Sequence, residues 1–267
     1  MRPRKPLATA LICLALLTTL QARAQSPEQR GLAIVQEADR RDLGWGDISS
    51  KLRMVLRNRH GETSTRELRT QFLEMPGGRG DGDKALIVFS SPRDIEGMAL
   101  LSHTKITEQD DQWLYLPALK RVKRVSSDNK SGPFVGSEFA YEDFLSQEVA
   151  KYTYRFLRNE PCGALACFVV ERYPVYVNSG YTRQIVWIDE AAYRTQKVEY
   201  YDRKNDLLKT LIFKDYRQYL DHYWRADERV MENHQTGKST TLLFTDYVFR
   251  SGLTEQDFIP ARLQSLR

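Results

Sequence analysis

Apolar and polar residues alternate along most of the chain beyond residue 47, which is the pattern of β-strands with one buried face. In the first expected strand, Ile48, Leu52 and Met54 share one face, while Lys51 and Arg53 share the other. Further expected strands cover residues 68–72, 85–89, 98–107, 112–116, 152–157, 168–173, 184–188, 196–201, 207–213, 218–224 and 239–249, most of them bounded by Gly, Asn, Asp or Pro. The pattern therefore predicts about ten or more short strands joined by hairpins.

Helical spacing replaces this alternation in a few segments. Ser26 and Gln29 form a capping-box pattern ahead of an apolar stripe, and Gly44 ends this first helix. Residues 139–148 and the tail after Thr254 are the other segments with helical character.

These elements together predict the architecture. A long antiparallel sheet twists strand by strand and therefore curls, and its inner apolar face has to be covered. The N-terminal helix and residues 139–148 are the available cover. We expect a mainly β (α+β) fold: a curved, half-open antiparallel β-barrel covered by a few helices, with a pocket between the layers. No Pro/Gly/Ser-rich linker and no repeat interrupts residues 25–267, which are expected to form a single domain.

The N-terminal segment has the composition of a secretory signal peptide. Three basic residues precede an apolar run over residues 7–20, and Ala22-Arg23-Ala24 supplies the small residues of a cleavage site. The run is shorter than the ~20 apolar residues of a membrane span. We expect residues 1–24 to be removed by cleavage after Ala24 and the mature chain to work in the periplasm.

Removal of this segment changes the electrostatic argument. The whole chain has 40 basic and 35 acidic residues, a net charge of +5, but four of the basic residues lie within residues 1–24. The mature chain then carries 36 basic residues against 35 acidic ones, a net charge of +1. Nucleic acid is therefore not an expected partner.

The mature chain retains Cys162 and Cys167 in the sequence PCGALAC. A pair so close together in an oxidising compartment is typical of a structural disulfide, and the spacing differs from that of a CxxC redox centre. Small residues between the two cysteines suit a tight turn. We expect a bridged hairpin that the disulfide stabilises by roughly 2 kcal/mol.

Patterns for common catalytic and metal centres are missing from the sequence. It contains no GxSxG and no HExxH motif, and its four histidines are widely separated. The acidic pairs Asp110-Asp111 and Glu142-Asp143 have the residue types of acid–base catalysts, but adjacent carboxylates rarely converge on one bond. We therefore expect no enzyme, no metal and no cofactor. A hydrolase with a site assembled from distant residues is the least favoured hypothesis.

The stretch WLYLPALKRVKR, residues 113–124, combines an expected strand with a cluster of basic residues. Residues 112–116 carry apolar side chains on both faces, and Pro117 ends the strand. Four basic residues follow: Lys120, Arg121, Lys123 and Arg124. Two interpretations stay open. The charges are solvated or meet the acids of SEFAYEDF, or they rim a cavity mouth and meet an anionic lipid head group or an acidic partner.

The block QWLYLPALKRVKRVSSDNKSGPFVGSEFAYEDF resembles the signature region of the LolA-like family of outer-membrane lipoprotein-sorting proteins. The turn GWGD and the segment NRHGETSTREL are also similar to that family. The resemblance implies a curved half-barrel of the LolA/LolB type with a hydrophobic cavity, working in the periplasm. LolA and LolB carry lipoproteins from an inner-membrane exporter to the outer membrane. Members of this branch are often associated with RND/MMPL-type exporters.

A carrier of this kind has to shield an acyl chain from water. Each buried methylene contributes about 0.8 kcal/mol, so a long chain needs an extended apolar lining. The expected lining residues are apolar side chains of the predicted strands, including adaptable methionines: Leu52, Met54, Phe72, Phe89, Met98, Trp113 and Tyr115.

These observations lead to two main hypotheses. The first is a periplasmic carrier or acceptor that binds an acylated lipoprotein or other envelope lipid in a hydrophobic cavity and moves it toward the outer membrane. The alternative is a non-enzymatic accessory subunit of an RND/MMPL-type exporter. Both predict transient membrane contact only.

Overall fold

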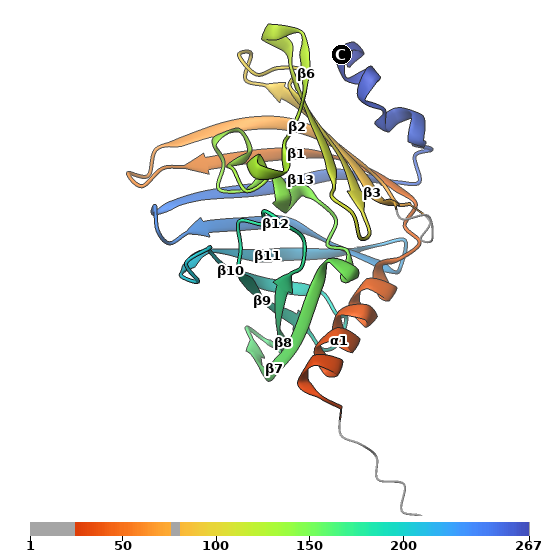
Figure 1. Ribbon diagram of the computed structural model, residues 1–267. Helices are drawn as coiled ribbons and strands as arrows, with labels where there is room; N and C mark the ends of the chain where they lie inside the picture. Colours follow the sequence, from red (N-terminus) through yellow and green to blue (C-terminus); the bar gives the residue numbers. More distant parts are fainter. Residues whose placement is uncertain (1–24, 76–80, 267) are drawn as a thin grey trace, which may run out of the picture.

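The computed structural model describes residues 25–75 and 81–266, in which thirteen strands form one antiparallel sheet (Figure 1). The strands are β1 Asp47–Arg57, β2 Thr63–Leu73, β3 Asp81–Ser91, β4 Ala99–Lys105, β5 Asp111–Leu116, β6 Arg121–Arg124, β7 Tyr152–Cys162, β8 Leu165–Pro174, β9 Arg183–Asp189, β10 Thr195–Tyr201, β11 Leu207–Tyr219, β12 Tyr223–Asn233 and β13 Lys238–Phe249. The signal peptide expected over residues 1–24 lies outside the described residues.

The sheet is open, with β6 at one edge and β7 at the other. Its order is β6-β5-β4-β3-β2-β1-β13-β12-β11-β10-β9-β8-β7, so the first and last strands of the chain pair in the middle. The sheet curls strongly around one side, which is its concave face (Figure 1). The predicted mainly β, half-open architecture is confirmed.

Helix α1, Pro27–Asp42, begins at the predicted capping box, in which Ser26 and Gln29 bond reciprocally. It packs along the edge strand β7 so closely that a Cβ at Gly31 would lie 2.7 Å from the backbone nitrogen of Phe156. The helix therefore covers the β7 edge of the sheet, which would otherwise be exposed, as well as part of the concave side (Figure 1). None of the helices within the described ranges is long and apolar enough to span a bilayer.

The predicted helix over residues 139–148 is wrong. The segment contains one short 3-10 turn, η4 Tyr141–Phe144, and a second turn, η5 Val149–Lys151, begins just after it. A regular helix does not form because the backbone and acidic side chains of the segment bond to other parts of the protein. Phe139 O accepts from Phe134 N at 2.7 Å, and Glu142 accepts from Gly180 N at 2.8 Å.

One predicted strand, residues 218–224, is interrupted: residues 218–219 end β11, residues 223–224 begin β12, and residues 220–222 form the turn between them. Leu220 and Asp221 have left-handed backbones, with φ of 51° and 54°. The turn contains neither glycine nor proline, so the sequence carries no strong turn signal. The long hairpin continues on both sides of it, as Tyr219 pairs with Tyr223.

The C-terminal tail forms two 3-10 turns, η6 Glu255–Phe258 and η7 Pro260–Ser265, on the outer face of the sheet beside β3–β6 (Figure 1). Phe258 and Leu263 are buried there against Leu101 and Tyr115. The tail thus covers one end of the convex side.

The predicted disulfide is confirmed. Cys162 and Cys167 are bridged across the β7–β8 hairpin, with their Cα atoms 5.9 Å apart. Cys167 is completely buried beside Val169 and Trp187. The bridge therefore fastens the far end of the hairpin to a small apolar cluster.

Candidate functional site

The concave face of the sheet has an apolar floor formed by its central strands. Leu52 and Met54 of β1 are 1% and 0% exposed, and Phe89 of β3 is 1% exposed. Register places Met54 opposite Leu242 of β13. All four side chains belong to the largest apolar cluster of the protein.

Residues 134–144, here called the plug, lie against this floor. Phe134 is fully buried, and its ring centroid lies 5.7 Å from that of Phe89 and 4.6 Å from that of Phe144. Phe139 and Tyr141 complete the aromatic group. The protein's own aromatic side chains thus occupy the concave face at this point.

A buried ion pair anchors the plug to the sheet. Lys209 of β11 donates to the Asp143 carboxylate at 2.7 Å and to the Glu138 carbonyl oxygen at 2.9 Å. The side chains of Lys209 and Asp143 are each 4% exposed. Tyr181 donates its hydroxyl hydrogen to the same carboxylate at 2.8 Å. These bonds compensate both charges for the loss of water.

Glu142 provides a second polar anchor. Its carboxylate accepts from Gly180 N at 2.8 Å, from Ser179 Oγ at 3.0 Å and from Tyr176 Oη at 3.1 Å. Burial nevertheless raises the pKa of Glu142. The acids of SEFAYEDF therefore bond to the plug's own surroundings and not to the basic segment.

The plug also contains a strained residue. Val135 has a left-handed backbone with φ 48° and ψ 42°, which is rare for a β-branched residue and costs about 1–3 kcal/mol. Its carbonyl oxygen accepts a hydrogen bond from the Arg66 guanidinium of β2. Neighbouring contacts therefore hold the chain in a conformation that it would not adopt alone.

The seven expected lining residues do not all come together. Leu52, Met54 and Phe89 form the concave floor, and Met98 packs against the same cluster. Phe72 lies against a separate small cluster that includes Trp45. The remaining two, Trp113 and Tyr115, are on the outer face beneath the C-terminal turns.

Strand β5 explains this division. Its Leu114 packs toward the concave cluster, so Trp113 and Tyr115 have to point to the opposite side. Both faces of β5 are apolar, because the C-terminal tail covers the outer one. The sequence shows that both faces are covered but not what covers each.

The four basic residues Lys120, Arg121, Lys123 and Arg124 are all exposed, on strand β6 and the residue before it. Arg124 forms an ion pair with Asp111. The adjoining turn η1, Pro117–Leu119, leaves Leu119 64% exposed. The segment is thus a cationic surface hairpin with an apolar residue at its tip.

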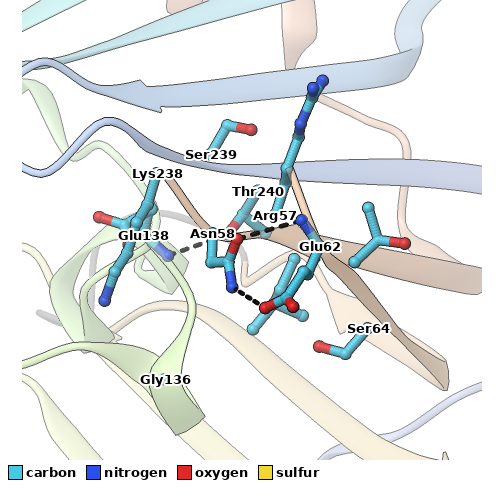
Figure 2. A pocket seen from close by; sticks show the side chains of 11 residues that line it. Arg57, Asn58, Glu62, Ser64, Gly136, Glu138, Lys238, Ser239 and Thr240 are labelled. Carbon is cyan, nitrogen blue, oxygen red and sulfur yellow. Dashed lines mark hydrogen bonds between the residues drawn. The ribbon is translucent and has the colours of Figure 1, made fainter. Parts of the chain in front are cut away.

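A polar groove of about 350 Å³ opens where the β1–β2 and β12–β13 turns approach the plug (Figure 2). Cationic, acidic and hydroxyl side chains line most of it, and Leu56 is its apolar contact. The lining residues are Leu56, Arg57, Asn58, Glu62, Thr63, Ser64, Gly136, Glu138, Lys238, Ser239 and Thr240. Sequence reasoning missed this groove because three separate parts of the chain form it.

Two carboxyl groups near the start of β3 have strongly raised pKa values. Burial raises the pKa of Asp83 to about 6, and the negative charge of Glu74 adds to this rise. Burial raises the pKa of Glu148 to about 7, and the negative charge of Asp83 adds to that rise. Asp83 accepts from Met75 N at 3.1 Å and from Ser146 Oγ at 3.2 Å. Across the described part of the chain, no group of three or more His, Cys, Asp or Glu residues is arranged to hold a metal ion.

Comparison with known proteins now identifies the group to which this structure belongs. A domain from Vibrio parahaemolyticus, named for outer membrane lipoprotein sorting, is 54% identical, with a TM-score of 0.86 over 89% of this chain and 99% of its own. A DUF1329 family protein from Desulfovibrio piger is 27% identical, with a TM-score of 0.84 over 89% and 99% of the two chains. A LolA superfamily protein from Nitrosomonas europaea, 20% identical over 86% and 98%, has the same fold with a TM-score of 0.67.

A family model described as an uncharacterized protein matches residues 81–265. No curated protein sequence matches the chain. The chain belongs to the same family as the Vibrio parahaemolyticus outer membrane lipoprotein-sorting domain, and it has a LolA-like fold.

The buried ion pair gives a first prediction. Lys209→Met should lower the free energy of unfolding by about 3–5 kcal/mol, because it leaves the Asp143 carboxylate buried without its cation. Lys214→Met is the matched control on the same strand, since its pair with Glu228 is exposed and contributes less than about 1 kcal/mol. Urea denaturation measures both. Equal effects of the two substitutions would show that the buried pair does not anchor the plug.

The raised pKa of Glu148 gives a second prediction. Ionisation of a carboxyl whose pKa is raised in the folded state destabilises the protein. For Glu148 this loss of stability develops as pH rises from the pKa of the unfolded state, about 4.3, through that of the folded state, about 7. Glu148→Gln avoids this loss, so its advantage over the wild type should grow from pH 5 to pH 8 by roughly 1–2 kcal/mol, allowing for partial exposure. Urea denaturation at both pH values measures it, with the exposed Glu108→Gln as control. A constant difference between the two pH values would contradict the argument.

Proposed function

We propose that this protein is a non-enzymatic periplasmic carrier or acceptor, with residues 25–267 acting as one lipid-binding β domain. It binds an acyl chain of a lipoprotein or other envelope lipid against the concave face and moves it toward the outer membrane. The signal-peptide pattern of residues 1–24 and the similarity to a domain named for outer membrane lipoprotein sorting support this proposal.

The observation that carries the proposal is the nature of the cover on the concave floor. The plug is neither a strand nor a regular helix, and its contact with Phe89 is made by aromatic side chains. An acyl chain can replace such contacts, because each methylene it buries contributes about 0.8 kcal/mol without needing a fixed geometry. When no cargo is bound, the plug stays on the concave floor and closes the lipid-binding site.

The proposed exchange is close to balanced, as release of cargo requires. Burial of an acyl chain of about 14 carbons contributes roughly 11 kcal/mol of favourable free energy. Displacing the plug costs a free energy of similar size, because its aromatic contacts with the floor are lost. Strain at Val135 lowers the cost of moving the segment from Phe134 to Gly136. The anchors at Glu142 and Asp143 keep the other end attached, so the plug can return.

Shortening the central aromatic side chain tests the exchange. Phe134→Ala should cost about 3–5 kcal/mol of stability and should increase the affinity for a fluorescent fatty acid, because it removes the ring that competes for the floor. Phe258→Ala is the matched control, since Phe258 is equally buried but lies on the outer face. It should destabilise without changing the affinity.

Unchanged fatty-acid binding in Phe134→Ala, or the same change in both variants, would contradict displacement of the plug. Native mass spectrometry of the mature protein purified from the periplasm provides a separate test. A bound acylated molecule supports carriage, whereas a protein that never retains or takes up any amphiphile would rule it out.

The alternative function, an accessory subunit of an RND/MMPL-type exporter, is favoured by the cationic hairpin. Lys120, Arg121 and Lys123 are exposed, and within residues 25–75 and 81–266 none of them forms an ion pair. Exposed Leu119 adjoins them. Charges and an apolar tip of this kind suit an acidic docking surface on a membrane protein.

Charge reversal of the hairpin tests this alternative. Arg121→Glu with Lys123→Glu should abolish cross-linking to an exporter identified by mass spectrometry in inner-membrane fractions, because attraction becomes repulsion. Lys204→Glu, on an exposed turn away from the hairpin, should leave cross-linking unchanged. Retained cross-linking in the double variant would count against this docking surface.

A further inference from the structure

Arg229 occupies an unusual position on the concave face. In one row across four strands, register places Met54 opposite Leu242, Leu242 opposite Arg229, and Arg229 opposite Phe213. Residues directly opposite one another in antiparallel strands project to the same face. The arginine is therefore part of the same surface as the apolar floor, about two strand spacings, or roughly 10 Å, from Met54.

Aromatic rings surround this arginine. Its guanidinium carbon lies 4.7 Å from the ring centroid of Phe244 and 5.6 Å from that of Phe213. Phe244 itself is buried in the apolar cluster. Stacking on rings favours the cation but supplies none of the oxygen acceptors that a guanidinium requires.

One hydrogen-bond donor of Arg229, its Nε–H, is unused. Its Nε is buried and has no partner, and no hydrogen bond or ion pair of the side chain occurs among the residues that the structure describes. Other cations on this face differ, because Lys209 bonds to Asp143 and Arg66 bonds to the Val135 carbonyl oxygen. A buried donor without an acceptor costs about 1–3 kcal/mol, so an oxygen-bearing anion would relieve an existing penalty.

Two tyrosines extend this environment. Tyr216 of β11 and Tyr247 of β13 both experience the positive charge of Arg229. Burial raises the pKa of Tyr247 to about 12, so its hydroxyl keeps its hydrogen at neutral pH. The Tyr216 hydroxyl donates to the Thr195 carbonyl oxygen and the Tyr247 hydroxyl to that of Ala226, so neither tyrosine supplies Arg229 with an anionic oxygen. Within the part of the chain that the structure describes, no carboxylate forms an ion pair with Arg229.

We propose that Arg229 binds the anionic group, a carboxylate or a phosphate, of an amphiphile whose apolar chain lies along the row toward Leu242 and Met54. This inference rests on the proposed lipid-binding function and assigns the charge of the ligand and its orientation. The planar guanidinium provides two parallel N–H donors, which match the paired oxygens of either group. The rings of Phe213 and Phe244 lie against the guanidinium, and its Nε is shielded from solvent.

Calorimetric titration of the mature protein tests the assignment with three probes of equal chain length, decanoate, decyl phosphate and decanol. Wild-type protein should bind at least one of the anions about tenfold or more tightly than the alcohol, as expected for a charge-assisted hydrogen bond. The arm with decanoate and the arm with decyl phosphate distinguish the two sources of negative charge. Arg229→Gln should remove the preference and leave decanol affinity within about twofold.

Arg53→Gln is the matched control. Arg53 lies opposite Leu243, next to the row of Arg229, but on the exposed outer face, where it pairs with Glu67. Its replacement should leave all three affinities unchanged. Arg229→Met, which removes the buried donor and keeps an apolar stem, should have a Tm equal to or above that of the wild type.

The outcomes separate the two claims. Equal affinities of wild-type protein for the anions and for decanol, or a preference that survives in Arg229→Gln, overturn the role of Arg229 and leave lipid carriage standing. Binding of none of the three probes overturns both. A large fall in Tm for Arg229→Met, with anion preference intact, assigns Arg229 a purely structural role.

Discussion

The structure depends on the need to cover the concave face of one long curved sheet. Thirteen antiparallel strands curl but do not close, so the apolar floor around Met54 and Phe89 cannot be buried by the sheet alone. Helix α1 covers only the β7 side. The plug supplies the remaining cover, and the aromatic ring of Phe134 fills the space over the floor. In the proposed carrier, bound cargo covers this apolar floor in place of the plug.

Two kinds of interaction hold the plug, and they have different consequences. Aromatic contacts with the floor are apolar and replaceable, whereas the Lys209–Asp143 pair and the bonds to Glu142 are directional and buried. Buried charges contribute little net stability but are strongly destabilising when one partner is lost, so they fix where the segment returns. Strain at Val135 lies in the apolar part and not beside these anchors. The segment thus has buried ionic anchors at one end, and at the other a strained residue that a hydrogen bond from Arg66 holds in place.

Much of this architecture could be predicted from the sequence. Period-two alternation located most strands, the capping box located α1, and the spacing of Cys162 and Cys167 predicted the bridged hairpin. The plug could not be predicted as such, because its form depends on acceptors and donors such as Gly180 N and Lys209 that are far away in sequence.

The candidate site was predicted only in part, for a related reason. Alternation shows that residues share a face but not which face is concave, so Trp113 and Tyr115 were grouped with Met54 although the C-terminal tail covers them. Arg229 was missed because no strand was predicted over residues 225–238, so nothing placed it on a face of the sheet. Met231, two residues further along β12, is buried and shares the face of Arg229.

Amide hydrogen exchange of residues 134–144, with and without a saturating acyl amphiphile, tests the central claim most directly. If plug and ligand compete for one surface, exchange in the plug should speed up when the ligand binds, while β1 and β13 stay protected. Exchange in the plug that is unchanged or slower with ligand bound would contradict the account, because the acyl chain would then lie elsewhere.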